Sequence, residues 1–184
     1  MRALSVTLIL VAGPIMAQDL AKTMELPAHN ALMALRDKAG LSKFESDGCS
    51  GGLSTTWRLV SDTFPEFAAA HEASPPWEEC CVIHDRAYHE AAGAATADES
   101  YDARIVADWA LRACVMEKGE VRAEDLAERY EVTPDQVRAA YETIAGAMYL
   151  AVRFGGGPCT GLPWRWGFGY PGCTPFDTMV PARE

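Results

Sequence analysis

The chain contains 184 residues, 49% of them hydrophobic, and carries a formal net charge of −10 at pH 7. This acidic balance argues against a nucleic-acid partner and against docking by bulk attraction to anionic lipid, but it leaves room for a local cation site. Residues 1–17 hold one arginine and an apolar run too short to span a bilayer, which is typical of a signal peptide, with cleavage predicted after Ala17. We therefore expect one exported domain, residues 18–184, secreted or periplasmic and without a transmembrane segment.

Hydrophobic periodicity predicts that this domain begins with a helix. Apolar residues at helical spacing cover 26–39, and Gly40 is a plausible stop. Residues 47–52, DGCSGG, are rich in glycine and polar residues and predict a tight loop. The pattern over 53–76 is ambiguous, because a Pro-Pro pair interrupts it.

The second half of the chain is predicted to be mostly helical, so the expected fold class is all-α. The predicted helices are 77–92, 99–118, 122–132 and 133–154. Gly93 and Gly119 are interpreted as stops after the first two of these, and Thr133 as the cap that opens the last. Residues 155–184 form a loop-like tail, whose aromatic stretch PWRWGFGY is expected to pack over the helices.

Six cysteines in an exported chain predict disulfides, and six allow 15 pairings. Cys80 and Cys81 are adjacent, and side chains of adjacent helical residues point about 100° apart. The two are therefore expected to bond with different partners. Cys159 and Cys173 are expected to close the tail into a ring.

Helical spacing separates the motif CCVIHDRAY into two faces. Cys80, His84 and Tyr88 share one face, since residues four apart are neighbours on a helix. If Cys80 bonds with Cys114 and the two helices run antiparallel, Asp108 approaches His84 and Tyr88. A carboxylate that fixes an imidazole facing a cleft is the arrangement of a general base.

The other face carries Cys81 and Asp85. A bond between Cys49 and Cys81 would bring the glycine-rich loop 47–52 within one helical turn of Asp85. Backbone carbonyl oxygens together with a carboxylate suit a hard cation such as Ca²⁺. This face therefore predicts a calcium site.

Three motifs of this sequence resemble the secreted phospholipase A2 family. CCVIHDRAY is similar to that family's C-C-x-x-H-D-x-C-Y signature, DGCSGG resembles its calcium loop, and DWALRAC resembles the end of its second long helix. The match covers about 47–52 and 77–115. The helix motif is specific, whereas the glycine loop alone is a weak signal.

The resemblance implies calcium-dependent hydrolysis of the sn-2 ester of a glycerophospholipid at a membrane or micelle surface. It implies two antiparallel disulfide-linked helices beside a calcium loop, with His84 as the base that activates water. Asp108 would orient His84, Tyr88 would hydrogen-bond Asp108, and an amide of Cys49 or Ser50 would help to stabilise the oxyanion. The implied calcium ligands are the Asp85 carboxylate and the carbonyls of Gly48, Ser50 and Gly52. The implied disulfides are Cys49–Cys81 and Cys80–Cys114, which join the expected Cys159–Cys173 bond of the tail to make three.

The sequence also departs from the family pattern. Ala87 and Ala107 stand where the family has two cysteines, and the joint loss of both supports the alignment of the two helices. Residues 53–76 lengthen the segment between Cys49 and Cys81 and are interpreted as an insertion.

Two alternative functions remain open from the sequence. One is a non-catalytic lipid- or protein-binding module that keeps the disulfide-linked helices. The other is a zinc hydrolase that uses His84, Asp85 and His89. Outside that alternative, His89 is expected to be a surface residue.

Overall fold

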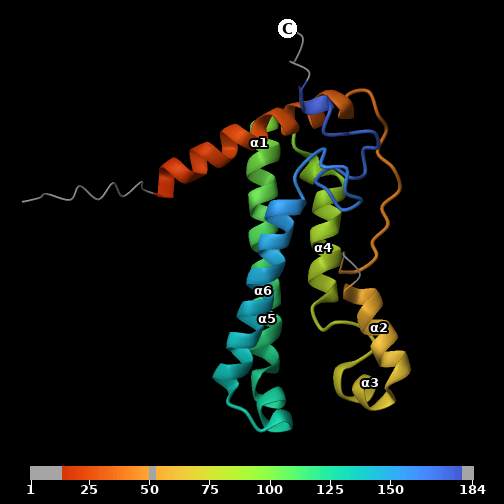
Figure 1. Ribbon diagram of the computed structural model, residues 1–184, viewed down its shortest axis with the longest axis vertical. Helices are drawn as coiled ribbons and strands as arrows, with labels where there is room; N and C mark the ends of the chain where they lie inside the picture. The colour runs from red at the N-terminus through yellow and green to blue at the C-terminus, as the bar shows by residue number, and fades with distance from the viewer. Residues whose placement is uncertain (1–13, 50–52, 180–184) are drawn as a thin grey trace, which may run out of the picture.

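The computed structural model describes residues 14–49 and 53–179 and is mainly helical, without strands in the described part of the chain, as the sequence predicted. Figure 1 shows the order of its elements. These are α1 (Pro14–Arg36), α2 (Leu53–Thr63), α3 (Pro65–His71), α4 (Glu78–His89), the 3₁₀ turn η1 (Ala91–Gly93), α5 (Ala97–Tyr130), α6 (Pro134–Gly155) and the 3₁₀ turn η2 (Asp177–Met179).

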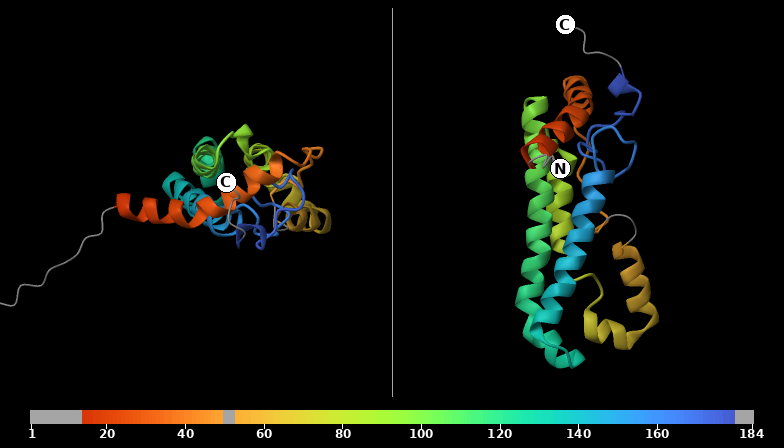
Figure 2. Two further views of the ribbon diagram at one scale, coloured as in Figure 1. Left: turned by 90° about the horizontal axis from the view of Figure 1, so that it is seen from above. Right: turned by 60° about the vertical axis from the view of Figure 1, so that its left-hand side comes forward.

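A long hairpin of α5 and α6 forms the frame of the molecule (Figures 1 and 2). Thr96 caps α5 by accepting from the Glu99 amide, and Thr133 opens α6 with the predicted cap. Thr133 and Gln136 each accept from the other's backbone amide, which closes a capping box. Three residues between the two helices thus reverse the chain sharply and hold α6 against α5.

The predicted break at Gly119 is wrong, because α5 runs unbroken from Ala97 to Tyr130 and contains the expected short helix 122–132. Gly119 is instead a contact residue between the two helices. A Cβ atom at Gly119 would lie 2.4 Å from the Cβ of Tyr141 on α6. The glycine therefore allows close packing rather than a stop.

This contact predicts opposite effects of two glycine-to-alanine substitutions. Alanine is the better helix former by about 1 kcal/mol, and a Cβ at Gly146 on α6 would meet nothing within 4 Å. We expect Gly146→Ala to raise the free energy of unfolding by up to about 1 kcal/mol. Gly119→Ala is expected to lower it by about 1–3 kcal/mol, because the root of the Tyr141 side chain cannot move without shifting a helix. Chemical denaturation of both variants tests this, and a stabilised Gly119→Ala would contradict it.

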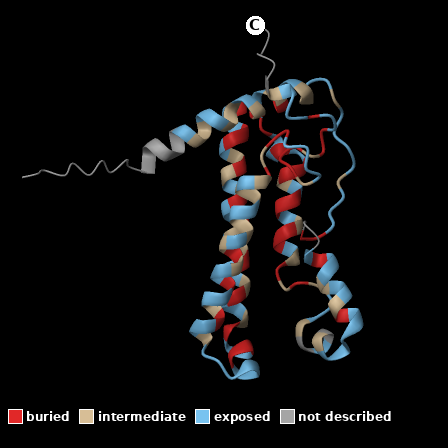
Figure 3. Ribbon diagram, in the orientation of Figure 1, coloured by how far each residue is buried: buried red, intermediate tan, exposed pale blue. Residues whose placement is uncertain are grey.

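α4 packs along α5 and runs antiparallel to it (Figure 1). The Cys80–Cys114 disulfide joins the two helices near the start of α4, and Cys49–Cys81 joins α4 to the loop before α2. Both predicted pairings are confirmed. Figure 3 shows that buried residues extend along most of α4, whereas α2 and α3 are largely exposed.

α1 is longer than predicted. It begins at Pro14 rather than near residue 26, continues through Pro27, and ends at Arg36, before Gly40. It lies across the end of the bundle where α4 finishes and α5 begins (Figures 1 and 2). None of the described helices combines the length and apolar character needed to cross a membrane.

The ambiguous segment 53–76 folds as the helix pair α2 and α3. Trp57 of α2 packs edge-on against Phe67 of α3, with ring centroids 5.1 Å apart, and against Trp77, with centroids 5.8 Å apart. These aromatic contacts attach the pair beside the start of α4.

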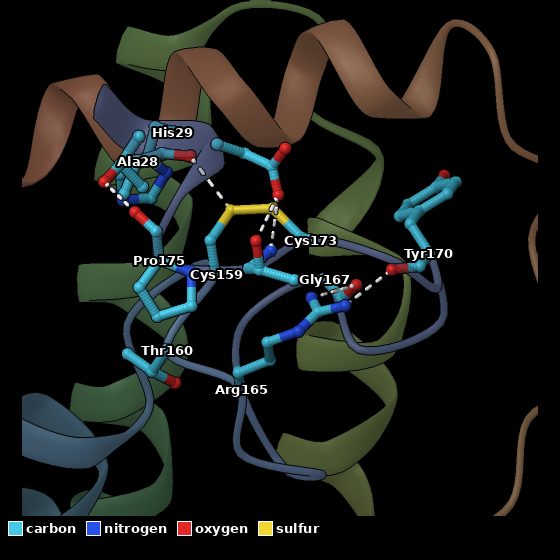
Figure 4. The surroundings of a disulfide bond; sticks show 12 residues. Ala28, His29, Cys159, Thr160, Arg165, Gly167, Tyr170, Cys173 and Pro175 are labelled. Atoms are coloured by element: carbon cyan, nitrogen blue, oxygen red, sulfur yellow. Dashed lines mark hydrogen bonds between the residues drawn. A yellow bond between two sulfur atoms is a disulfide. The ribbon is translucent and has the colours of Figure 1, made fainter. Parts of the chain in front are cut away.

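The tail packs over the helices, as expected, but in successive turns rather than as an extended strand. Trp166 is fully buried, with its ring against Tyr88 of α4, and its Nε1 donates to Ser100 Oγ at 2.9 Å. The third predicted disulfide, Cys159–Cys173, is also confirmed. Within the ring that it closes, buried Arg165 donates to the carbonyls of Gly167 and Tyr170 (Figure 4).

Candidate functional site

His84, Tyr88 and Asp108 meet at the interface between α4 and α5. His84 Nε2 lies 3.1 Å from Asp108 Oδ1, and the Tyr88 hydroxyl donates to the same oxygen at 2.6 Å. Asp108 is fully buried, and His84 and Tyr88 are 6% and 1% exposed. The three residues that helical spacing placed together are therefore in contact.

Two constraints produce this contact. His84 lies four positions after Cys80 on α4, and Asp108 lies six positions before Cys114 on α5, so both side chains lie about one to two turns from the disulfide. Because the helices run antiparallel, moving forward along α4 from Cys80 and backward along α5 from Cys114 goes in the same direction in space. The disulfide thus sets the register that brings imidazole to carboxylate.

The hydrogen bonds around Asp108 determine which nitrogen of His84 carries the proton. Arg153 Nη1 donates to Asp108 Oδ2 at 2.9 Å, so the Asp108 side chain acts as an acceptor on both oxygens. Burial raises the pKa of the Tyr88 hydroxyl well above its ordinary value, so Tyr88 stays protonated and donates. The proton of neutral His84 accordingly lies on Nε2. Its Nδ1 is left as a base, with no hydrogen bond to any other residue of the described chain.

Asp85 points to the other side of α4, towards the loop before α2. Ser46 Oγ donates to Asp85 Oδ2 at 2.6 Å and accepts from the Gly48 amide at 3.1 Å. Burial raises the pKa of the Asp85 carboxyl, and the Ser46 hydrogen bond offsets only part of that effect. Asp85 is therefore a buried carboxylate that a cation would stabilise.

Gly48 fits the loop for two reasons. Its φ of +85° is unfavourable for residues with a side chain, and a Cβ there would lie 2.5 Å from Glu78 Oε1 and 2.6 Å from Ser54 Oγ. The Cys49–Cys81 disulfide holds the next residue against α4. The loop backbone at 48–49 is thereby fixed close to Asp85.

The remaining loop residues can be followed only in part. Ser50 and Gly52, two of the expected carbonyl ligands, lie outside the described residues. The Cys49 amide donates to Ser54 Oγ at 2.8 Å. Of the two amides expected to stabilise an oxyanion, that of Cys49 is thus already engaged, and that of Ser50 lies outside the described residues.

A cavity of about 170 Å³ opens directly onto both His84 and Asp85. Apart from these two residues its walls are mostly apolar and come from α2, α4, α5, α6 and the tail. The residues that line it are Cys49, Leu53, Cys81, His84, Asp85, Leu111, Met148, Ala151, Val152 and Trp164. A base and a carboxylate thus face one apolar cavity, which suits a substrate with a reactive group and a hydrocarbon portion.

A second hollow lies beyond Asp85 and Trp164. Its lining includes Glu45, Ser46 and Asp47 from the loop, so it is more polar than the first. Trp164 forms a wall of both and lies on Gly155, where a Cβ would come within 2.3 Å of the indole ring. Asp85 therefore lies between an apolar cavity and a more polar hollow that carries further carboxylates.

The expectation that His89 is a surface residue is wrong, since it is only 4% exposed. The tail covers it: a Cβ at Gly169 would lie 2.6 Å from the His89 ring, and Phe168 packs edge-on against it. No group of three His, Cys, Asp or Glu side chains within residues 14–49 and 53–179 is arranged to hold a metal ion. The zinc hydrolase alternative, which needs His84, Asp85 and His89 together, therefore has no support in the described chain.

Two contributors to the site were not predicted. Arg153 reaches Asp108 from the last turn of α6, where a basic residue is ordinarily explained by the helix dipole. Ser46 reaches Asp85 from the residue just before the DGCSGG motif. A serine beside a glycine-rich loop ordinarily indicates only a turn. The sequence around Arg153 and around Ser46 therefore contains no pattern that identifies their partners.

No protein-family model matches the sequence, and neither a curated protein nor a solved structure shows significant similarity to it. The functional interpretation therefore depends on the residues and geometry of the site itself.

Proposed function

We propose that this protein hydrolyses the sn-2 ester of glycerophospholipids in a calcium-dependent reaction of the secreted phospholipase A2 type. One observation carries the proposal: His84, held through Nε2 by buried Asp108, faces an apolar cavity that it shares with the Asp85 carboxylate. Three disulfides are compatible with an oxidising compartment, which supports the further proposal that the protein is exported.

In the proposed reaction, His84 Nδ1 takes a proton from water as the water oxygen attacks the ester carbonyl. Asp108 stabilises the imidazolium that forms. When the tetrahedral intermediate collapses, the same nitrogen returns the proton to the glycerol oxygen that leaves. The products are a fatty acid and a lysophospholipid, and no covalent acyl-enzyme is required.

The described residues fit a hard cation beside His84. Within the described residues, the buried Asp85 carboxylate accepts from one neutral hydroxyl, that of Ser46, and the Gly48 backbone lies next to it. Asp85 and the carbonyls of Gly48, Ser50 and Gly52 would hold Ca²⁺. A bound Ca²⁺ supplies positive charge that polarises the ester carbonyl and offsets the charge of the phosphate.

The first test is release of fatty acid from phosphatidylcholine vesicles, measured with Ca²⁺ and with a chelator. We expect hydrolysis that depends on Ca²⁺. If the wild-type protein binds vesicles but releases no fatty acid from any phospholipid, the enzyme proposal is wrong and the non-catalytic lipid-binding alternative is favoured.

An exposed aromatic residue in the last turn of α6 makes a second prediction. Phe154 is 86% exposed and lies one turn beyond Ala151, which lines the cavity. If this surface meets lipid, Phe154→Asp removes an apolar contact worth about 1.5–3 kcal/mol, which lowers hydrolysis of vesicles by about ten- to a hundredfold. Hydrolysis of a monomeric short-chain phosphatidylcholine should stay within about twofold, because the cavity is unchanged.

Val121→Asp is the matched control for this variant. Val121 is 79% exposed and lies towards the opposite end of the α5–α6 hairpin. The control should hydrolyse vesicles at the wild-type rate. Equal losses in the two variants, or an equal loss on vesicles and monomers for Phe154→Asp, would contradict a lipid-facing role for this end of α6.

A further inference from the structure

Arg153 connects the carboxylate behind His84 to the N-terminal helix. Its Nη1 donates to Asp108 Oδ2 at 2.9 Å, and its Nη2 donates to Glu25 Oε1 of α1 at 2.7 Å. The Arg153 side chain is 12% exposed and that of Glu25 is 24% exposed. One guanidinium group thus bridges two carboxylates that are far apart in the sequence.

Arg104 of α5 strengthens the same connection. It is fully buried, forms an ion pair with Glu25 Oε2, and donates from Nε to the Tyr88 hydroxyl at 3.3 Å. Its Nη2 donates to the carbonyls of Val152 and Arg153 at 2.8 Å each, which fixes the backbone that carries Arg153. Arg104 therefore ties α1, α4 and α6 together around Asp108.

Glu25 balances the positive charge of Arg104 and Arg153 beside Asp108. Glu25 pairs with both Arg104 and Arg153, whereas Asp108 pairs with Arg153. Among the described residues, removal of Glu25 therefore leaves Arg104 without an ion-paired carboxylate and Arg153 with Asp108 alone. Burial opposes ionisation of Glu25, but His29, Arg104 and Arg153 outweigh it and hold the pKa of the carboxyl below its ordinary value. Glu25 is accordingly charged at neutral pH.

We propose that Glu25 is a positioning residue for the site: by holding Arg153 and Arg104, it keeps Asp108 in the place where it aligns His84. The proposal rests on the proposed function for its kinetic consequence. Without Glu25, Arg153 is free to turn towards Asp108 with both donor nitrogens, which draws the carboxylate away from His84 Nε2. α1 would then contribute to the reaction and not merely cover the end of the bundle.

The kinetic test compares Glu25→Gln with Glu25→Asp in the full chain, on a monomeric short-chain phosphatidylcholine at saturating Ca²⁺. A displacement of about 1 Å at a catalytic group costs about a hundredfold in rate, so we expect Glu25→Gln to lower kcat by about ten- to a hundredfold. KM should stay within about twofold, because Glu25 is not among the residues that line the cavity. Glu25→Asp, which keeps the charge, should recover part of the loss.

Lys22→Met is the matched control for a merely structural role of α1. Lys22 pairs with Asp98 at 3.0 Å and with Asp102 at 3.3 Å, so it also fixes α1 to α5. It forms no ion pair with the carboxylates that Arg104 and Arg153 bind. Its kcat should equal that of the wild type. If Lys22→Met and Glu25→Gln lower kcat equally, or if folded Glu25→Gln keeps the wild-type kcat, the proposal is wrong.

A second readout does not depend on turnover. In the wild type, the proton on His84 Nε2 that is shared with Asp108 should give a slowly exchanging downfield NMR resonance, and Glu25→Gln should broaden or lose it. If the wild type hydrolyses no phospholipid, the proposed function fails while this resonance still tests the positioning role. An unchanged resonance in Glu25→Gln overturns the inference. Should that variant not fold, Arg153→Lys replaces it, because a lysine keeps the charge but cannot bridge both carboxylates in the manner of a guanidinium group.

Discussion

Replacing His84 by glutamine is expected to lower kcat for phosphatidylcholine hydrolysis by about 10²–10⁴-fold, the usual contribution of a general base. Glutamine is similar in reach and can still donate a hydrogen bond to Asp108 Oδ1, so the buried carboxylate keeps a partner. It has no group that can take a proton from water near neutral pH. Calcium affinity should stay nearly unchanged, since His84 is not one of the proposed ligands.

The measurement pairs initial rates at saturating Ca²⁺ with calorimetric titration of Ca²⁺ into each variant. His71→Gln is the matched control, because His71 stacks on Tyr130 with centroids 5.7 Å apart and does not line the cavity. It should keep the wild-type rate. Full activity of His84→Gln would show that the proposed mechanism is wrong, whatever the calcium affinity.

The contact between α4 and α5 could be predicted because local rules determine it. The spacing of Cys80, His84 and Tyr88 follows from the helical repeat, and a single disulfide to Cys114 then sets the register of the second helix. Neither step requires knowledge of the rest of the fold. The residues alone suggested the Cys159–Cys173 bond of the tail, whereas the resemblance supported the partners of Cys80 and Cys81.

The contacts that were missed depend on how distant segments dock. Arg153 meets Asp108 across 45 residues and Glu25 across 128, so both ion pairs exist only once α1 and α6 have packed against α5. His89 is buried by tail residues about 80 positions later. Sequence periodicity describes one element at a time and carries no information on such pairs.

At Gly119, packing between distant segments made a local prediction wrong. In isolation a glycine after a helical stretch indicates an end, because glycine is a poor helix former and a common C-cap. Here close approach of Tyr141 requires a residue without Cβ in the middle of α5. Tertiary packing therefore reverses the local interpretation.

The second large effect is expected at Asp85, where loss of activity should accompany a gain in stability. Burial raises the pKa of this carboxyl, so folding favours its protonated form and the ionised form is destabilising. That cost is absent below the pKa of the unfolded chain and is fully present above the raised pKa of the folded state. In a chelator at neutral pH, Asp85→Asn should therefore unfold at a higher temperature than the wild type, and the difference should shrink as the pH falls towards 4.

If Asp85 is a calcium ligand, adding Ca²⁺ should make the wild type unfold at a higher temperature than Asp85→Asn. At a free concentration one hundred times the dissociation constant, binding stabilises the wild type by about 2.7 kcal/mol, which corresponds to about 5–10 °C for a domain of this size. Asp85→Asn should show little of this shift and lose calcium-dependent hydrolysis, and Asp85→Lys should lose both entirely. Because the Asn side chain can still accept from Ser46 Oγ, the loop need not rearrange in the first variant. Calcium-stimulated hydrolysis by Asp85→Asn at the wild-type rate would remove Asp85 from the ion site, and the chemistry proposed for His84 would then need another source of positive charge.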